Sequence, residues 1–438
     1  MIKVTFIGAG STIFAKNILG DIMLCESIRD AEFALYDIDR ERLDDSKIVI
    51  DAINKKYNEN RAKIKCYLGV EQRKEALAGA DFVVNAIQVG GYEPCTVIDF
   101  EIPKKYGIKQ TIADTLGIGG IFRGLRTLYV MKDIAKDMEE VCPNAWLLNY
   151  TNPMAIVSGY MQRYTNVKTV GLCHSVQVCS EALLNALDIK VDGFKDKIAG
   201  INHMAWLLEI TDLKGNDLYP EIKKRAALKN ETEKHGDMVR YEYIKHLGYY
   251  CTESSEHNAE YNPFFIKPNY PELIDKFNIP IDEYIKRCIS QIEGWKKQRD
   301  EILNGGDIIH ERSREYGSRI IEAMVTNKTY KIGGNVLNTG LITNLPQNAC
   351  VEVPCLVDGN GIQPTVIGDL PEQLAAMNRT NINPQILTIE AAATGKREHI
   401  YHAAMLDPHT AAVLSIDDIV AMCDELFEAH ESAGFKIL

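Results

Sequence analysis

No run of apolar residues in this chain approaches the ~20 residues that are needed to span a bilayer. Residues 1–10 also lack the charged, apolar and small-residue regions of a signal peptide, so we expect no export signal. Positive charge is in deficit, with a formal net charge of −12, and no basic patch stands out. These absences argue against nucleic-acid and membrane partners, and they favour a cytoplasmic protein that acts on a small molecule.

A disulfide framework is absent as well. The eleven cysteines are an odd number and are scattered along the chain, which favours reduced thiols in the cytoplasm. We find no internal repeat, low-complexity tract or flexible linker. The 438 residues suit two large parts that share one interface, with ample material for a core.

The first dozen residues carry the most informative pattern that is present. Residues 4–7 read as a buried strand that runs into Gly8 and Gly10. Ser11 then precedes apolar residues at helical spacing. Strand, glycine turn and helix open a dinucleotide-binding unit, in which the helix N-terminus faces the phosphates. The third glycine of the fingerprint is replaced by Ile13, so an ordinary strand–helix turn is the alternative to a cofactor site.

The end of the second expected strand supports the cofactor. Residues 33–36 form that strand, and Asp37 follows it. A carboxylate at this point accepts hydrogen bonds from the ribose hydroxyls of NAD and repels the 2′-phosphate of NADP. Asp39 is a weaker candidate for the same role, and Asn85, at a later strand end, is a further candidate contact. We therefore predict an NAD site.

The chain continues as an alternation of strands and helices. We expect strands at 64–68, 81–87, 146–149 and 167–173, and helices at 125–138 and 154–163. This alternation predicts a Rossmann-type, doubly wound parallel sheet that forms an NAD-binding domain over residues 1–195. Residues 196–438 have a mixed α+β texture and are expected to complete the site for the metal and the substrate. Their expected helices lie at 285–303 and 308–325, and their expected strands lie at 206–213 and 350–356.

Three polar residues follow two apolar segments in a way that suits a metal. Cys173 and His174 close one expected strand, and His203 follows another short apolar segment. A thiolate and an imidazole from two loops could hold a divalent metal ion. Such a pair also arises by chance and lacks the spacing of a four-ligand zinc set. His174 is equally a candidate substrate contact or an ordinary polar residue at a strand end, and spacing leaves these alternatives open.

Three more polar segments are candidates for the site. Residues 149–153 place asparagine amides after a central strand, residues 113–120 form a glycine-rich loop, and residues 247–257 collect titratable side chains. On local grounds the first two are equally ordinary turns or connecting loops, and the third is better explained as an exposed loop. A tyrosine in the third segment is a poor base near neutral pH unless a cation lies close to it.

Taken in order, these segments resemble glycoside hydrolase family 4 along essentially the whole chain. The resemblance rests on Phe6–Ser11, the strand end at Asp37, Asp114–Gly120, Asn149–Pro153, Gly171–Ser175, Gly200–His203, and Gly340–Pro346 before Val351–Pro354. Each motif is weak alone, but the ordered set is specific. The resemblance implies NAD, a divalent metal that is usually manganese, and a fold similar to that of lactate and malate dehydrogenases.

The residues after Cys173 resemble one branch of that family. Members that cleave 6-phospho-glycosides carry Cys-Asn or Cys-Asp followed two residues later by proline, whereas this chain has Cys-His-Ser-Val. The resemblance therefore implies an α-galactosidase whose partner is an unphosphorylated α-galactoside. The α-glucosidase, α-glucuronidase and α-galacturonidase branches are the alternatives.

The reaction implied by the resemblance is an exception to hydrolysis by two carboxylates. NAD⁺ takes a hydride from C3 of the sugar, and the ketone that results makes the C2 proton acidic. The metal stabilises the enolate as a Lewis acid while a base removes that proton and the substituent at C1 leaves. Water then adds and the hydride returns, so the cofactor is not consumed.

The resemblance also implies roles for individual residues. Cys173 and His203 would bind the metal ion. Asn152 and Asp114 would contact the substrate. His174 would contact the substrate or deliver a proton to the leaving group.

The base that removes the C2 proton is expected to be Tyr250. A nearby metal ion would lower the pKa of its hydroxyl toward the working pH. Tyr249 is adjacent, and some α-glycosidases of the family use an acidic residue instead. This segment offers Glu253 and Glu256, with Ser255 near the position of that acid.

Two other classes of function are alternatives. A 2-hydroxy-acid dehydrogenase of the same fold would use His203 as a proton relay and would produce NADH stoichiometrically. A nucleotide-sensing regulator would bind NAD without turnover, but the acidic charge and the lack of a helix-turn-helix count against it. For the enzyme we expect a homodimer or a homotetramer.

Overall fold

The structure is a computed structural model that describes residues 1–303 and 308–438. The strands in these ranges are β1 (Ile2–Ile7), β2 (Ala31–Asp37), β3 (Lys63–Leu68), β4 (Phe82–Asn85), β5 (Trp146–Asn149), β6 (Lys168–Gly171), β7 (Phe194–Ile201), β8 (Met204–Asp212), β9 (Tyr250–Cys251), β10 (Tyr330–Leu337), β11 (Cys350–Asp358) and β12 (Gly361–Pro364). The α-helices are α1 (Thr12–Met23), α2 (Arg40–Tyr57), α3 (Arg73–Leu77), α4 (Val97–Lys105), α5 (Gly117–Val141), α6 (Met154–Tyr164), α7 (His174–Ala186), α8 (Tyr219–Thr232), α9 (Met238–Leu247), α10 (Ser255–Glu260), α11 (Glu272–Lys276), α12 (Glu283–Leu303), α13 (Gly317–Thr326), α14 (Glu372–Thr394), α15 (Glu398–Leu406), α16 (Pro408–Val413) and α17 (Ile416–Ser432).

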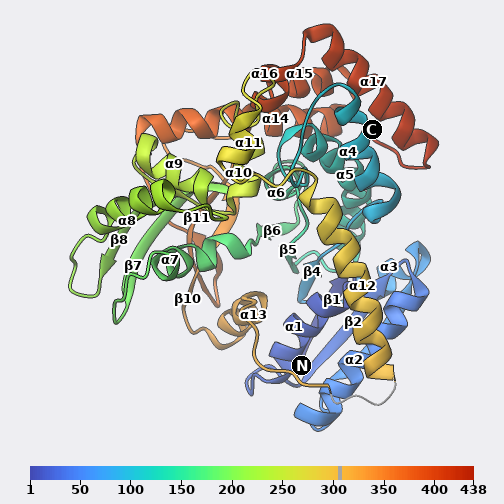
Figure 1. The fold of residues 1–438 in the computed structure, drawn as a ribbon. Helices are drawn as coiled ribbons and strands as arrows, with labels where there is room; N and C mark the ends of the chain where they lie inside the picture. The colour runs from blue at the N-terminus through green and yellow to red at the C-terminus, as the bar shows by residue number, and fades with distance from the viewer. Residues whose placement is uncertain (304–307) are drawn as a thin grey trace.

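One mixed sheet runs through the molecule in the strand order β3-β2-β1-β4-β5-β6-β10-β11-β7-β8-β9, with β12 paired to β11 (Figure 1). The first six strands are parallel, and their order is that of a Rossmann nucleotide-binding sheet. The expected fold class is therefore confirmed. β4 and the second half of β1 are buried on both faces, as strands between two helical layers must be.

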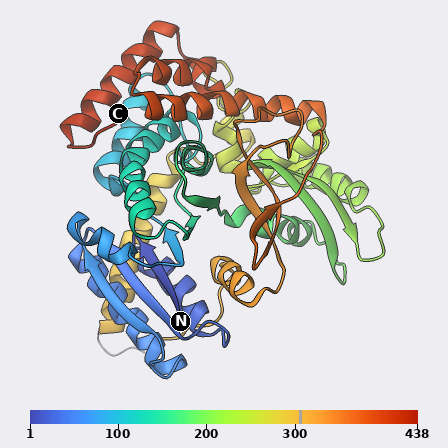
Figure 2. The same ribbon diagram turned by 180° about the vertical axis from the view of Figure 1, so that it is seen from behind.

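The second half of the chain extends this sheet instead of forming a separate lobe. β10 runs antiparallel beside β6, with Asn335 opposite Gly171, and β11, β7, β8 and β9 follow outward. The expected boundary between residues 195 and 196 therefore falls inside β7. Helices α14 to α17 return to the first half and pack over α4, α5 and α6, as Figure 1 and Figure 2 show at the top of the molecule.

One expected helix is only partly helical. We expected a helix over 308–325, whereas residues 308–316 form an irregular strap and α13 follows it. The Asp21 carboxylate on α1 holds this strap. It accepts hydrogen bonds from the Ser313 N–H and hydroxyl (2.9 and 2.6 Å) and pairs with His310 at 3.1 Å. These bonds to a distant helix override the local apolar periodicity.

The expected glycine-rich loop also differs, because residues 117–120 are the first turn of α5. A Cβ on Gly119 would lie 2.6 Å from the carbonyl oxygen of Ala113, and one on Gly120 would lie 2.6 Å from that of Thr115. The two glycines therefore allow α5 to begin directly against the chain that precedes it.

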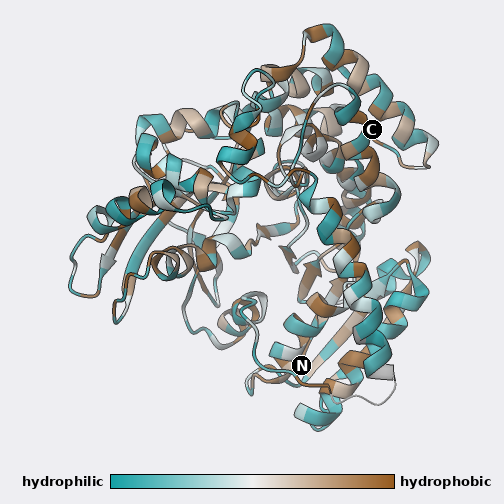
Figure 3. Cartoon of the chain, viewed as in Figure 1, coloured by the Kyte–Doolittle hydropathy of each residue, from teal (hydrophilic) through white to brown (hydrophobic). Residues whose placement is uncertain are grey.

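Apolar side chains fill the layers beside the sheet. The outer helices α2 and α8 carry many hydrophilic residues, as the colouring of the chain shows (Figure 3). All eleven cysteines are free thiols, and all but Cys66 are buried. Within the ranges that the structure describes, every helix is too short or too polar to cross a bilayer.

A buried ion pair ties the C-terminal helix to the first half. Arg126 on α5 donates two hydrogen bonds to Asp99 on α4 (3.0 and 2.6 Å), and His430 on α17 lies 2.9 Å from the same carboxylate. The Arg126 and Asp99 side chains are 0% and 3% exposed. Water therefore cannot solvate either charge if its partner is removed.

Asp99→Asn is expected to lower the free energy of unfolding by about 3–5 kcal/mol, because it leaves the Arg126 guanidinium buried without a counter-charge. Asp133→Asn is the control. It disturbs an exposed pair with Lys136 and should change the free energy of unfolding by less than about 1 kcal/mol. Urea unfolding of both variants measures the difference, and two equally small effects would contradict the structural role of the buried pair.

Candidate functional site

The glycine turn after β1 has the geometry of a phosphate cradle. Gly8 adopts φ +85°, which favours glycine, and a Cβ there would lie 2.9 Å from the carbonyl group of Ala86. Helix α1 begins directly after Ser11, whose side chain makes no capping bond. The first N–H groups of α1 therefore face the turn without a side-chain cap, as an anion site requires.

Asp37 closes this cradle. Its carboxylate accepts hydrogen bonds from the N–H groups of Gly10 (2.6 Å), Ile38 (2.8 Å) and Asp39 (3.0 Å). A Cβ on Gly10 would lie 2.7 Å from Oδ2 of Asp37, so the approach of Asp37 requires a glycine there. The Asp39 side chain instead caps α2 by accepting a bond from the Arg42 N–H at 3.1 Å. Asp37 is thus better placed than Asp39 to face a ribose.

Asn85 is fully buried at the end of β4. Its amide donates hydrogen bonds to Asn149 (2.8 Å) and to Thr151 (3.1 Å). These bonds join the ends of β4 and β5 and support the loop over residues 149–153. Asn85 therefore has a supporting role in this loop, and its buried Oδ1 makes no hydrogen bond within the described ranges, so its expected contact with the cofactor stays a prediction.

The structure brings Cys173 and His203 together. Cys173 lies just past β6 and precedes α7, whereas His203 lies in the two-residue turn between β7 and β8 with φ +65°. Ligand atoms of Cys173, His203 and Glu253 lie within 4.8 Å of one another. Burial raises the pKa of the Cys173 thiol, and a bound cation would reverse that shift by stabilising the thiolate.

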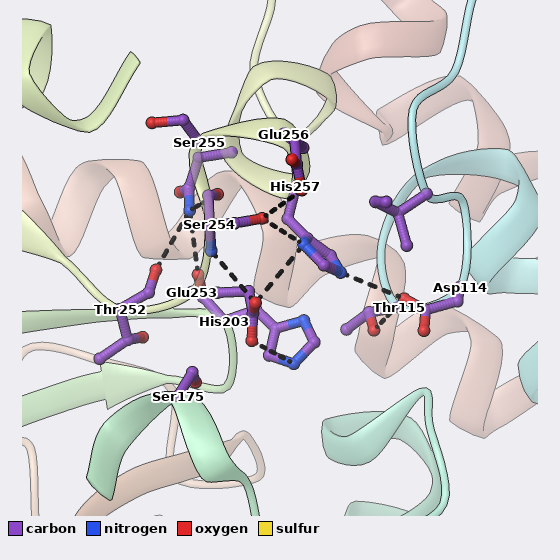
Figure 4. Close-up of polar contacts among 12 residues, drawn as sticks. Asp114, Thr115, Ser175, His203, Thr252, Glu253, Ser254, Ser255, Glu256 and His257 are labelled. Atoms are coloured by element: carbon purple, nitrogen blue, oxygen red, sulfur yellow. Dashed lines mark hydrogen bonds and ion pairs between the residues drawn. The ribbon is translucent and has the colours of Figure 1, made fainter. Parts of the chain in front are cut away.

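Glu253 reaches this group from the turn between β9 and α10, where it also has a left-handed backbone (φ +62°). Its carboxylate lies 3.3 Å from Nε2 of His203 and 3.6 Å from Nδ1 of His257. Nε2 of His257 lies 3.7 Å from Oδ1 of Asp114. Figure 4 shows these four side chains pointing toward one another.

A second set of donors overlaps the first. Ligand atoms of Asp114, His203 and His257 also lie within 4.8 Å of one another. The Ser254 hydroxyl lies 2.8 Å from Nδ1 of His257, and the Asn152 amide donates to Asp114 at 3.4 Å. Asn152 and Asp114, the two residues expected to contact the substrate, are therefore neighbours beside the metal-ligand candidates.

The charges in this cluster hold one another in their ionised forms. Burial would raise the pKa of Glu253, but His203 and His257 outweigh it and bring that pKa to about 2. Burial would lower the pKa of His257, but Glu253 and Asp114 raise it to about 9. Burial would also raise the pKa of Asp114, yet His257 and Arg123 lower it. The site is therefore a dense arrangement of paired, buried charges.

Glu260 holds the loop that carries Asp114. Its buried carboxylate accepts hydrogen bonds from the N–H groups of Thr111 (2.7 Å) and Ala113 (2.8 Å). Ala113 adopts φ +54°, so the chain is left-handed at three points around the site. Such conformations cost about 1–3 kcal/mol each and cluster where function requires them.

His174 lies beside Cys173 at the start of α7, and its side chain is half exposed. Its Nε2 is 2.6 Å from a carboxylate oxygen of Glu315, which belongs to the strap, and this hydrogen bond raises the pKa of the imidazole. The rings of Tyr150 and Phe14 lie 5.9 and 6.2 Å from its ring. Because Phe14 is on α1, His174 lies between the cofactor cradle and the metal-ligand candidates.

Tyr250 does not reach this cluster, so its expected role as the C2 base needs correction. Its hydroxyl donates to Asp237 at 2.6 Å, and the Arg240 guanidinium lies 4.4 Å from the centre of its ring. Burial raises its pKa far above the usual value. Sγ of Cys251, the next residue in β9, lies 3.9 Å from the His203 carbonyl oxygen. Successive side chains of a strand point to opposite faces, so Tyr250 points away from His203 and its neighbours.

Of the alternatives to Tyr250, Glu253 lies in the cluster, whereas Ser255 donates a hydrogen bond to Asp237. Sequence reasoning missed His257 and Glu315. The four-residue spacing of Glu253 and His257 is a signal that could have linked them, but the segment reads as an exposed loop. Glu315 carries no such signal, since it meets a residue 141 positions away.

Another buried carboxyl lies near Cys173. Glu352 on β11 is 0% exposed and accepts hydrogen bonds from the amides of Asn335 (2.9 Å) and Asn202 (3.5 Å). Its second oxygen and both amide oxygens make no hydrogen bond within the described ranges. Burial raises the pKa of Glu352 to about 7. A proton on this carboxyl would supply a donor for one of the unpaired oxygens.

Two family models and several known proteins resemble this chain. The model described as family 4 glycosyl hydrolase matches residues 3–189, and that of the family 4 glycosyl hydrolase C-terminal domain matches residues 198–410. The chain is 64% identical over 430 residues to an α-galactosidase of Bacillus subtilis (strain 168), which covers 98% of each chain. It is 34% identical over 442 residues to an α-galactosidase of Rhizobium meliloti (strain 1021), covering 98% of this chain and 88% of that one.

A solved structure has the same fold. It is a 6-phospho-α-glucosidase from gut microorganisms, in complex with NAD and Mn²⁺. The TM-score is 0.80 at 21% identity, and the match covers 98% of both chains. The mixed sheet described above is therefore shared by a protein that differs in most of its residues.

Glu352→Gln is expected to change how stability depends on pH. Folding raises the pKa of Glu352 from 4.5 to about 7, so the folded protein binds this proton more tightly than the unfolded chain does. The resulting stabilisation is full below pH 4.5 and is lost as the pH rises through about 7. As the pH rises, the free energy of unfolding of the wild type should therefore fall by up to about 3 kcal/mol. The variant, whose glutamine is neutral at every pH, should not show this fall.

Urea unfolding at acidic and at mildly alkaline pH, with a chelator present, measures this loss. Glu209→Gln is the control, because Glu209 is an exposed residue of β8 whose substitution should leave the pH dependence as in the wild type. The same pH dependence in Glu352→Gln and the wild type would show that the carboxyl is not protonated preferentially in the folded state.

Proposed function

This chain belongs to family 4 of the glycosyl hydrolases, and we propose that it is an NAD- and manganese-dependent α-galactosidase. The observation that carries the proposal is the 64% identity to an α-galactosidase over 98% of both chains. The glycine turn and the Cys173–His203 pair support the same activity from the side of the structure.

The residues of the site fit both NAD and a divalent metal ion. Gly8 and the uncapped start of α1 form a cradle for a pyrophosphate, and the Asp37 carboxylate, which takes three N–H bonds, keeps acceptor capacity for ribose hydroxyls. Cys173 and His203 offer a thiolate and a neutral imidazole, the forms in which these residues bind a divalent ion. The NAD and Mn²⁺ in the solved 6-phospho-α-glucosidase support both assignments.

NAD in the cradle at Gly8 would supply a reversible hydride acceptor for the sugar, and a metal ion on Cys173 and His203 would supply a Lewis acid. The side chains then have to bind the sugar and move two protons. Asn152 and Asp114, which contact each other at 3.4 Å, bind sugar hydroxyls in this proposal. His174, oriented by Glu315, contacts the sugar or holds the proton for the leaving oxygen on its imidazole.

For removal of the C2 proton, His257 replaces Tyr250 in this proposal. The His257 ring lies 5.0 Å from the ring of His203, and Ser254 orients it through Nδ1, which leaves Nε2, 3.7 Å from Asp114, to accept the proton. A general base has to lie within reach of the proton that it removes, and His257 borders the metal-ligand candidates whereas Tyr250 does not. A cation held by His203 also opposes positive charge on His257 and so favours its neutral, proton-accepting form.

The 2-hydroxy-acid dehydrogenase and the nucleotide-sensing regulator are set aside, because glycosyl hydrolase models match both halves of the chain. The alternatives to α-galactosides as substrates of the same reaction are α-glucosides, α-glucuronides and α-galacturonides. We further propose a cytoplasmic homodimer or homotetramer. The free thiols of all eleven cysteines support a reducing compartment.

Aryl α-galactosides should be hydrolysed only when NAD⁺ and Mn²⁺ are both present, and NADH should not accumulate, because the hydride returns to the sugar. In D₂O the released galactose should carry deuterium at C2, because the C2 proton is removed and replaced from solvent. Release of p-nitrophenol and mass spectrometry of the sugar measure these outcomes.

Matched aryl α-glucosides, α-glucuronides and α-galacturonides are the controls for the sugar, and faster turnover of one of them would reassign the substrate. Full activity in protein freed of NAD would contradict the redox route. Net NADH from lactate or malate would support the dehydrogenase instead.

Asp37→Ala should weaken NAD binding by about 1–3 kcal/mol, because it removes the acceptor for the ribose hydroxyls and the anchor of the Gly10 N–H. Asp39→Ala is the matched control. It removes the cap of α2, at a cost of about 1 kcal/mol in stability, and should leave NAD affinity unchanged. Calorimetric titration with NAD⁺ distinguishes the two, and an unaltered affinity in Asp37→Ala would place the ribose elsewhere.

A further inference from the structure

We propose that Glu253 is a third protein ligand of the metal ion, alongside Cys173 and His203. The inference rests on the metal dependence proposed above and extends it, because it assigns a carboxylate to the ion. It also gives Glu253 a role in metal binding and none in proton transfer, although its carboxylate lies 3.6 Å from His257, the proposed base.

The three donor atoms are already gathered around one point. They lie within 4.8 Å of one another, and Oε2 of Glu253 is 3.3 Å from Nε2 of His203. Donor atoms that each lie about 2.0–2.3 Å from a shared ion are at most about 4.6 Å apart. Small movements of these side chains therefore complete a three-ligand site.

The backbone of Glu253 aims the carboxylate at this point. Its φ of +62° is unfavourable for a glutamate, and residues in such conformations cluster at ligand and active sites. Oε1 accepts a hydrogen bond from the Ser254 N–H at 3.1 Å, which leaves Oε2 turned toward His203. His203 has the same left-handed backbone at +65°, so two unfavourable turns bring their side chains to one place.

A carboxylate supplies what the Cys–His pair lacks. A thiolate and an imidazole are ligands that suit zinc and copper, whereas manganese prefers the hard oxygen of a carboxylate. Two anionic ligands, Cys173 and Glu253, also balance the two positive charges of the ion. That balance matters because these side chains are largely enclosed, with Cys173 8% and Glu253 21% exposed.

The overlapping donors, Asp114 and His257, have other partners. Asp114 accepts a hydrogen bond from the Thr115 hydroxyl at 2.7 Å, and Nδ1 of His257 lies 2.8 Å from the Ser254 hydroxyl. These bonds keep the pair on the side of the site where the sugar is proposed to bind. The thiol side of His203 is thus the place for the ion, and Glu253 is the carboxylate that faces it.

Binding of Mn²⁺ to the full-length, metal-stripped protein tests the assignment without any turnover. The probe is Mn²⁺ alone, and its unbound fraction is read from the electron paramagnetic resonance signal. Glu253→Gln keeps the shape of the side chain but removes its charge, and it should weaken Mn²⁺ binding by at least about tenfold. Zn²⁺ affinity should fall less, because the thiolate and the imidazole remain.

A positive and a negative control accompany the Glu253→Gln variant. Cys173→Ser is expected to lose Mn²⁺ binding. Glu242→Gln is the matched negative control, because Glu242 on α9 pairs with His246 at 3.2 Å, much as Glu253 pairs with His203, but lies outside both donor sets. Circular dichroism confirms that each variant is folded.

Unchanged Mn²⁺ affinity in Glu253→Gln, with binding lost in Cys173→Ser, would overturn the third ligand and leave the proposed function standing. Unchanged affinity in both variants would overturn the metal assignment of the proposed function itself. Should Glu253→Gln fail to fold, Glu253→Asp replaces it. This shorter carboxylate should bind Mn²⁺ more weakly than the wild type, and equal affinity would also overturn the proposal.

Discussion

The junction between β6 and β10 is the constraint on which the rest of the site depends. There the parallel nucleotide-binding sheet meets the antiparallel strands of the second half, with Asn335 opposite Gly171. A Cβ on Gly171 would lie 2.8 Å from that of Asn335 and 2.6 Å from the Met154 sulfur. A glycine therefore lets the two halves form one sheet, and that sheet brings Cys173, just past β6, next to the turn between β7 and β8.

Buried charge is the second constraint, and it links the site to the surrounding chain. Glu253, His257 and Asp114 are enclosed and ionised, so each depends on the others for its charge. Glu260 and the strap hold this arrangement from outside, since one fixes the loop before Asp114 and the other brings Glu315 to the site. A dication that enters such a cluster meets negative groups which the fold has already desolvated. In the proposed function, the contacts that join the two halves would also arrange this cluster for the metal ion.

Local patterns predicted the first half of the fold closely. The strand, glycine turn and helix at the N-terminus, and the strand at 146–149, occur where the periodicity places them. Two features that local patterns did not predict share one cause. The strap over 308–316 and the buried amide of Asn85 are set by hydrogen bonds to distant segments. The orientation of Tyr250 follows from a two-residue strand that is too short to show an alternation.

The amino-acid sequence by itself determined the nucleotide-binding half, the family, and two metal-ligand candidates, Cys173 and His203. These features depend on short motifs and on local periodicity. The tertiary structure alone decided that Glu253 lies with Cys173 and His203, that His257 lies with His203 and Asp114, and that Tyr250 faces away from them. Those outcomes depend on which strands pair and in what register. No short segment carries that information, since strand pairing is settled by packing between parts of the chain that are far apart.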